Sequence, residues 1–230
     1  MIPTDILDDN AAIDNDTRIL EDIHLNTKNI AIYQRGTAPM KKGLAKAAQR
    51  AMEFRAIGTV EEITLSLGNH FAKVLPGHVD LMEDILHLLG LFEQVAKVYT
   101  FRVVLARVGT TMCPRFHADN NQLRMLCTYY GPGTLWLPEH AVDRKAYQNG
   151  KGNQNILLDE SFVQQVDTGD VVILKGALYP DATPILHRSP NIQKNSGERL
   201  LLTIDTNEPL HLSTRPQKKR NGIRMTVKST

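Results

Sequence analysis

The chain has 230 residues, of which 42% are hydrophobic and 23% charged, and its formal net charge at pH 7 is +2. This length and apolar content predict one globular unit and exclude a wholly disordered chain. The small net charge gives no reason to expect nucleic-acid binding, and two cysteines are too few for a disulfide framework. No apolar run reaches the roughly 20 residues that cross a bilayer, and the first residues lack the pattern of a secretion signal. We therefore expect a soluble cytoplasmic protein with no membrane partner.

Residues 1–97 are predicted to be mainly helical and to pack on the domain that follows. One short strand is expected at 29–33, where isoleucines alternate with other residues. A helix is predicted over 40–54 and another over 79–95. The second helix would carry one apolar stripe, made of Leu81, Ile85, Leu88, Leu89 and Phe92.

From residue 98 the pattern changes to short strands separated by turns. Strands are predicted at 98–108, 123–130, 134–137, 162–166, 171–174, 185–187 and 200–204. Such a series is typical of a sandwich or of a barrel such as a jelly roll. We predict an α+β fold in which a jelly-roll, cupin-like barrel over 98–210 is flanked by the N-terminal helices. Residues 211–230 would form a basic tail of the same folded unit.

The strongest chemical signal is the pair His117 and Asp119. Residues two apart on an extended segment point to the same side, so an imidazole and a carboxylate could face one ion together. His187 follows 70 positions later, at the end of a short apolar segment. Two histidines and one carboxylate form the facial triad that binds Fe(II) and leaves positions open for other ligands. A satisfied polar cluster is the alternative interpretation of the same three residues.

The stretch HADNNQLRMLCTYYGPGTLWLP resembles the iron(II)/2-oxoglutarate-dependent dioxygenase superfamily, in particular its prolyl-hydroxylase-like members. VDTGDVVILKG and HRSPNIQKNSGERLLLTID are similar to later parts of the same double-stranded β-helix, and the resemblance covers roughly residues 98–206. The chain as a whole also resembles a family of conserved bacterial proteins, and this second resemblance implies no activity.

The superfamily resemblance implies that His117, Asp119 and His187 bind Fe(II) and that 2-oxoglutarate is a small-molecule co-substrate. Arg199 would bind the distal carboxylate of 2-oxoglutarate, because guanidinium is a planar, permanently charged donor. Tyr129 or Tyr130 would add a neutral hydroxyl donor. Arg124 would point into the barrel toward the primary substrate. Four other arginines are alternatives for the co-substrate: Arg102, Arg107, Arg124 and Arg188.

A second hypothesis is a non-catalytic, cupin-like metal-binding protein that acts in metal homeostasis or sensing. Zinc would then bind the same three residues, with Cys113 as a candidate fourth ligand. A third is an interaction module in which the N-terminal helices recognise a partner. The sequence leaves the primary substrate open under the first hypothesis.

Overall fold

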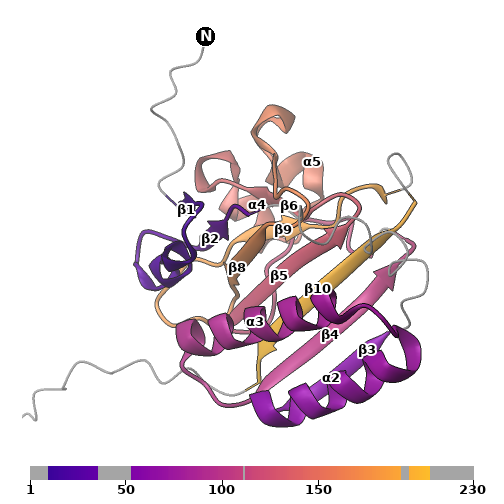
Figure 1. Cartoon of the computed structure of the whole chain (residues 1–230). Coiled ribbons are helices and arrows are strands. Elements are labelled where there is room, and N and C mark those ends of the chain that lie inside the picture. Colours follow the sequence, from indigo (N-terminus) through magenta and orange to yellow (C-terminus); the bar gives the residue numbers. More distant parts are fainter. Residues whose placement is uncertain (1–9, 36–52, 111, 193–196, 208–230) are drawn as a thin grey trace, which may run out of the picture.

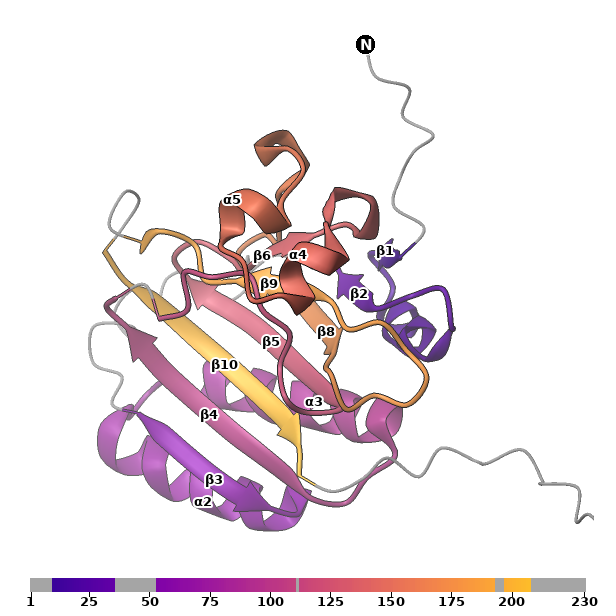
Figure 2. The same ribbon diagram turned by 180° about the vertical axis from the view of Figure 1, so that it is seen from behind.

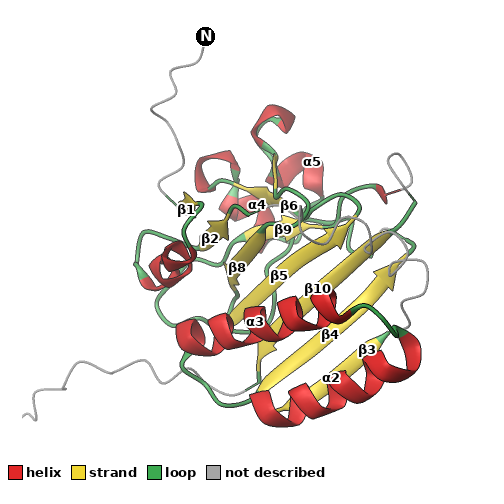
Figure 3. Cartoon of the chain, in the orientation of Figure 1, coloured by secondary structure: helices red, strands yellow, loops and turns green. Residues whose placement is uncertain are grey.

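The computed structural model describes residues 10–35, 53–110, 112–192 and 197–207, which form two β-sheets and a few helices (Figures 1 and 3). The large sheet contains, in spatial order, β1 (Ala11–Asp14), β2 (Ile30–Tyr33), β8 (Val171–Lys175), β5 (Leu123–Tyr130), β10 (Arg199–Thr206), β4 (Phe101–Val108) and β3 (Phe54–Gly58). The small sheet contains β7 (Gln164–Gln165), β6 (Leu135–Leu137) and β9 (Leu186–Arg188).

Strands from both halves of the chain interlock in the large sheet. The parallel pair is β1 with β2, and the other neighbours in this sheet are antiparallel. The last strand, β10, lies between β5 and β4, and β2 and β3 pair with β8 and β4. The region 1–97 therefore contributes three strands to this sheet, of which the sequence predicted β2. Most of the helix predicted over 40–54 lies outside the described residues, and Phe54 begins β3.

Two long helices cover one face of the large sheet, which we call the helix face (Figure 1). They are α2 (Val60–Val74) and α3 (Val79–Ala96). Thr59 caps α2 through a capping box, in which its hydroxyl accepts from Glu62 N and the Glu62 carboxylate accepts from Thr59 N. The predicted stripe of α3 is buried against the sheet, so this helix is confirmed.

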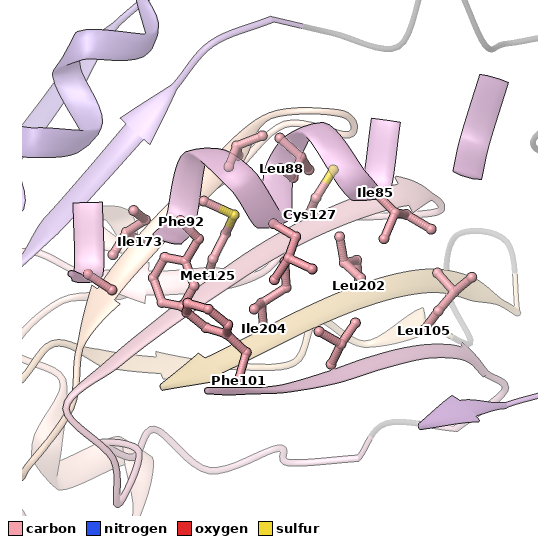
Figure 4. Close-up of a cluster of buried hydrophobic side chains, with 14 of the residues drawn as sticks. Ile85, Leu88, Phe92, Phe101, Leu105, Met125, Cys127, Ile173, Leu202 and Ile204 are labelled. Carbon is pink, nitrogen blue, oxygen red and sulfur yellow. The ribbon is translucent and has the colours of Figure 1, made fainter. Parts of the chain in front are cut away.

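Alternation along the strands supplies the other half of this core. On β5 the helix face receives four side chains: Leu123, Met125, Cys127 and Tyr129. Together with α3 and residues of β4, β8 and β10, they form the largest apolar cluster of the described residues (Figure 4). Burial of this many apolar side chains is the main source of the fold's stability.

The opposite face of the large sheet, which we call the site face, is partly covered by the small sheet (Figure 2). Leu126, Val172 and Leu174 of the large sheet pack there with Trp136 of β6. The remaining short helices are η1 (Thr17–His24), η2 (Glu139–Ala141), α4 (Arg144–Gln148), α5 (Asn153–Ile156) and η3 (Glu160–Phe162).

The prediction of a mixed fold with two packed sheets is confirmed, whereas the described strands do not close into a barrel. The strands of the small sheet have only two or three residues each, which leaves part of the large sheet uncovered (Figure 2). The N-terminal region also contains α2, a helix that the sequence analysis did not predict. Within the ranges that the structure describes, no helix has the length and apolar character needed to cross a membrane.

Candidate metal centre

The two candidate histidines are held side by side by their own backbones. His117 N donates to His187 O and His187 N donates to His117 O, each at 3.0 Å, in an isolated antiparallel bridge. The two rings consequently lie with their centroids 4.6 Å apart. Because His187 belongs to β9, which pairs with β6, the bridge joins the loop after β4 to the small sheet. The bridge thereby brings together two histidines that are 70 positions apart in the sequence.

Asp119 completes the cluster. Its Oδ2 lies 3.3 Å from His187 Nε2, and its Oδ1 lies 3.8 Å from His117 Nε2. Each of the three residues offers a ligand atom within 4.8 Å of the others, and the described residues contain no other cluster of this kind. The structure therefore brings the three predicted ligands together in the arrangement of a facial triad.

Burial sets the protonation of this cluster. His187 is 5% exposed, and desolvation, followed by the charges of His117 and Arg124, lowers its pKa to about 3. His187 is consequently neutral near pH 7, as a metal ligand must be. Desolvation also raises the pKa of Asp119, against the opposing charges of Arg124 and His117. His117 Nδ1 lies 2.9 Å from the Arg115 carbonyl, so a proton there leaves the Nε2 lone pair facing Asp119.

Two buried atoms of the cluster have no hydrogen-bond partner: Asp119 Oδ2 and His187 Nδ1. Buried polar atoms are normally satisfied, so an unpartnered carboxylate oxygen among imidazoles needs an explanation. A cation bound to Oδ2 would supply one. The donor set of two imidazoles and one carboxylate thus fits a divalent transition metal such as Fe(II) or Zn²⁺.

The loop that carries the triad is fixed by the segment after β8. The carbonyls of Asp119, Asn121 and Gln122 accept from three successive backbone amides, those of residues 176–178, at 2.7–3.0 Å. Gly176 is required at this approach, because a Cβ there would lie 2.2 Å from Asn121 O.

The insertion between β6 and β7 holds the same loop from the other side. The Asn153 amide accepts from Phe116 N at 2.9 Å and donates to Pro114 O at 2.8 Å. The Tyr147 hydroxyl accepts from Ala118 N at 3.2 Å. Each side of His117 is therefore tied to a separate element, which gives the ligands a defined position.

Arg199 is a buried cation on the site face that lacks an acidic partner. Its side chain lies between the sheets, where NH2 donates to Thr128 Oγ1 at 2.9 Å and to Thr134 Oγ1 at 3.2 Å. The residue is 1% exposed, its Nε has no partner, and no carboxylate of the described residues pairs with it. Desolvation accordingly lowers its pKa to about 10. A buried guanidinium bonded only to neutral hydroxyls is the environment expected where an anion binds.

A family model described as "Protein of unknown function (DUF1826)" matches residues 14–205, which is most of the chain. The chain belongs to this family. No curated protein matches the sequence.

The fold of this DUF1826 protein is similar to that of a solved dioxygenase. The dioxygenase for auxin oxidation 1 from Arabidopsis thaliana, solved in complex with 2-oxoglutarate, matches at 10% identity with a TM-score of 0.54. The match covers 87% of this chain and 93% of that one. A Pseudomonas putida prolyl-4-hydroxylase matches at 12% identity, 81% and 95% coverage and a TM-score of 0.41. The match to the auxin dioxygenase confirms, for the fold, the resemblance predicted from sequence.

Two of the side chains singled out in this DUF1826 protein have other partners in the structure. Arg124 does not reach toward a substrate, because Asp119 and Asp205 engage its guanidinium on two sides. Tyr129 lies on the helix face, where its hydroxyl donates to Asp84 Oδ2 at 2.6 Å, away from Arg199. Tyr130 is half-buried and packs against the helix-face core.

The alternatives considered from sequence also have defined places. Arg107 pairs with Glu198, Arg102 is exposed, and Arg188 stacks on the Phe116 ring at 4.5 Å. Cys113 is exposed and does not belong to the ligand cluster. The sequence analysis missed two partners of the site: Thr128, whose position on β5 places it on the same face as Arg124, and Asp205 on β10.

Proposed function

We propose that this protein is an iron(II)- and 2-oxoglutarate-dependent oxygenase. His117, Asp119 and His187 would bind the metal, and Arg199 would bind the distal carboxylate of 2-oxoglutarate. One observation carries the proposal: a three-ligand cluster and a buried arginine without an acid both border the small sheet, the cluster through His187 on β9 and the arginine through Thr134, which directly precedes β6. Either feature alone has structural explanations, but their combination matches what a metal-chelating dicarboxylate requires.

The ligand set favours a catalytic metal over a structural one. Structural zinc sites are usually closed by four protein ligands, whereas the cluster of described residues has three. Cys113, the fourth ligand considered from sequence, is exposed and outside the cluster. Three ligands leave coordination positions for a co-substrate and for oxygen. This count supports the oxygenase over the zinc-binding alternative.

Arg199 suits the far end of the co-substrate. Its position on β10 gives it a rigid backbone, and the Thr128 and Thr134 hydroxyls orient NH2 without neutralising the charge. The unpartnered Nε remains available as a further donor. A carboxylate bound there would receive charge-assisted hydrogen bonds in a dry environment, where they are strongest.

The chain's own residues would divide the work as follows. His187 and His117 would each present an imidazole nitrogen to the metal, and Asp119 would present Oδ2. Iron, when bound, would supply oxygen activation for attack on a C–H bond of the substrate. The apolar cluster around Leu126 and Trp136 lies next to the site, because Trp136 on β6 pairs with His187 on β9. This cluster would exclude water from the side of the site that it covers.

The test uses the full chain purified without a chelating tag. Anaerobic Fe(II) and 2-oxoglutarate should together give a visible charge-transfer band, and aerobic turnover should form succinate. The analogue 2-oxobutyrate keeps the chelating oxo-acid but lacks the distal carboxylate, so it should bind far more weakly. His187→Ala should abolish the band with either compound. Stoichiometric zinc that resists exchange, with no band and no succinate, would contradict the proposal and favour a metal-binding protein.

A further inference from the structure

We propose that Arg124 and Asp205 are positioning residues that hold Asp119 so that only its Oδ2 is offered to a metal. This inference rests on the metal centre of the proposed function. Arg124 NH1 donates to Asp119 Oδ1 at 2.5 Å, while Oδ2 is buried and makes no hydrogen bond. The two oxygens of one carboxylate are thereby assigned different roles.

The Arg124 side chain is itself fixed from behind. Its Nε donates to Asp205 Oδ1 at 2.6 Å and its NH2 donates to Oδ2 at 3.0 Å, which is a two-point contact. Asn121 adds a third hydrogen bond, from Nδ2 to Asp205 Oδ1 at 2.8 Å. Because a planar guanidinium bound at two points has little freedom to rotate, its remaining donor has a defined direction.

The anchor of this chain of contacts is the large sheet. Arg124 on β5 and Asp205 on β10 are paired directly in register. Asp119, in contrast, lies in a loop. Two adjacent strands therefore hold the Asp119 carboxylate, a ligand in a loop, in a fixed position. Metal ligands need such supporting contacts to keep a precise geometry.

Charge and burial argue against a purely structural ion cluster. The Asp119 and Asp205 side chains are 9% and 10% exposed, and the Arg124 side chain is 25% exposed. Two carboxylates and one guanidinium leave one uncompensated negative charge next to two imidazoles. A cluster built only for stability would have no reason to leave Asp119 Oδ2 unpartnered. A bound cation accounts for both the extra charge and the free oxygen.

The test measures metal binding by the apoprotein rather than turnover. Arg124→Met should weaken Co(II) and Fe(II) binding by about 10- to 100-fold, the range typical for partners of metal ligands. Arg124→Lys should lose less, because an ammonium can still contact Oδ1. Asp205→Asn should weaken binding by about tenfold although Asp205 does not touch Asp119. Arg124→Met should also change the Co(II) absorption spectrum, because Oδ1 is then free to approach the metal.

Arg35→Met is the matched control, since Arg35 forms a comparable ion pair with Asp84 on the helix face. It should leave the Co(II) dissociation constant within twofold of wild type. If Arg124→Met fails to fold, the nearly isosteric Asp205→Asn decides. Wild-type affinity or tighter binding in the folded Arg124 or Asp205 variants would overturn this inference and leave the proposed function standing. Failure of the wild-type apoprotein to bind any of Fe(II), Co(II) or Zn²⁺ would remove both.

Discussion

Each face of the large sheet has an arginine that is largely shielded from solvent, and the two arginines have opposite surroundings. On the helix face, Arg35 forms a two-point ion pair with Asp84 at 2.5 and 2.8 Å, and its Nε donates to Gly169 O. On the site face, Arg199 has only hydroxyl partners and an unused Nε. Burial lowers the pKa of both groups, but the Asp84 carboxylate outweighs it and raises the pKa of Arg35.

The same contrast extends to the rest of each face. The helix face is a continuous apolar core in which Tyr129, Asp84 and Arg35 satisfy one another. Most of the buried side-chain atoms without a hydrogen-bond partner belong instead to residues on or beside the site face: Asp119, Asn121, His187, Arg188 and Arg199. Unsatisfied polar groups cost stability, so their concentration on one face indicates that this face serves binding and the other serves stability.

Breaking the ion pair of the helix face should have the largest effect on folding. Arg35→Met leaves Asp84 buried without its cation, and we expect a loss of about 3–5 kcal/mol in the free energy of unfolding. Urea denaturation would measure this loss. Metal affinity should be unchanged, because the pair lies across the sheet from the triad. If Arg35→Met kept full stability but bound metal more weakly, the helix face would serve binding rather than stability, which contradicts our assignment.

Deleting apolar volume on the helix face should give a similar but slightly smaller loss. Leu88 is fully buried in α3 and faces the sheet (Figure 4). Leu88→Ala should cost about 2–5 kcal/mol through lost burial and the cavity left behind. Thermal denaturation with and without Co(II) would separate stability from binding. The ligand-induced rise in melting temperature should survive, and its loss would mean that this core also supports the triad.

How much of this division was predictable from sequence differs between the faces. The apolar stripe of α3 and strands β5 and β8 are local patterns, and they were predicted nearly to the residue. The capping-box residues Thr59 and Glu62 also predict the start of α2, although the sequence analysis did not use them. Strands β1 and β3 were missed because they are short and depend on partners far away in the chain. The predicted barrel closure is not seen in the described strands, and closure likewise depends on pairings between distant segments.

The site shows the same limit. The spacing of His117 and Asp119 in the sequence was enough to predict that they lie close together. The bridge between His117 and His187 is a long-range pairing, which local spacing does not predict. Tyr129 could have been excluded, because alternation along β5 places it on the face opposite Arg124. The Arg124 contact with Asp205 was not accessible, since it requires the register of β5 against β10.

Removing the arginine of the site face should affect binding but not folding. Arg199→Met should weaken 2-oxoglutarate binding by about 100-fold, which is about 2.8 kcal/mol. The free energy of unfolding should stay within about 1 kcal/mol of wild type or increase, because an unpaired buried charge is lost. Anaerobic titration and urea denaturation would measure the two quantities. Thr128→Val is the matched control, with a smaller loss of affinity. A large loss of stability in Arg199→Met would show that Arg199 is structural.

The smallest effect concerns Lys175, a buried cation on the helix face with no acidic partner among the described residues. Its Nζ donates to the Leu25 carbonyl at 2.9 Å and lies 4.5 Å from the centre of the Tyr179 ring, so neutral groups satisfy it. No ligand is needed to explain this lysine, in contrast to Arg199. Desolvation nevertheless lowers its pKa from 10.5 to about 8.

This shift predicts a pH dependence with a definite sign. Between pH 8 and 10.5 the unfolded chain keeps a proton on Lys175 that the folded chain has released. Stability from this group therefore rises with pH in that window, and the full cost of burying the charge applies below it. Relative to Lys175→Met, wild type should gain free energy of unfolding from about pH 7 to about pH 10. Urea denaturation of both proteins across this range measures the difference, in which titrations common to both cancel. A stability difference between the two proteins that does not change with pH would mean that the Leu25 carbonyl and the Tyr179 ring stabilise the ammonium as well as water does. The pKa of Lys175 would then not be lowered by folding.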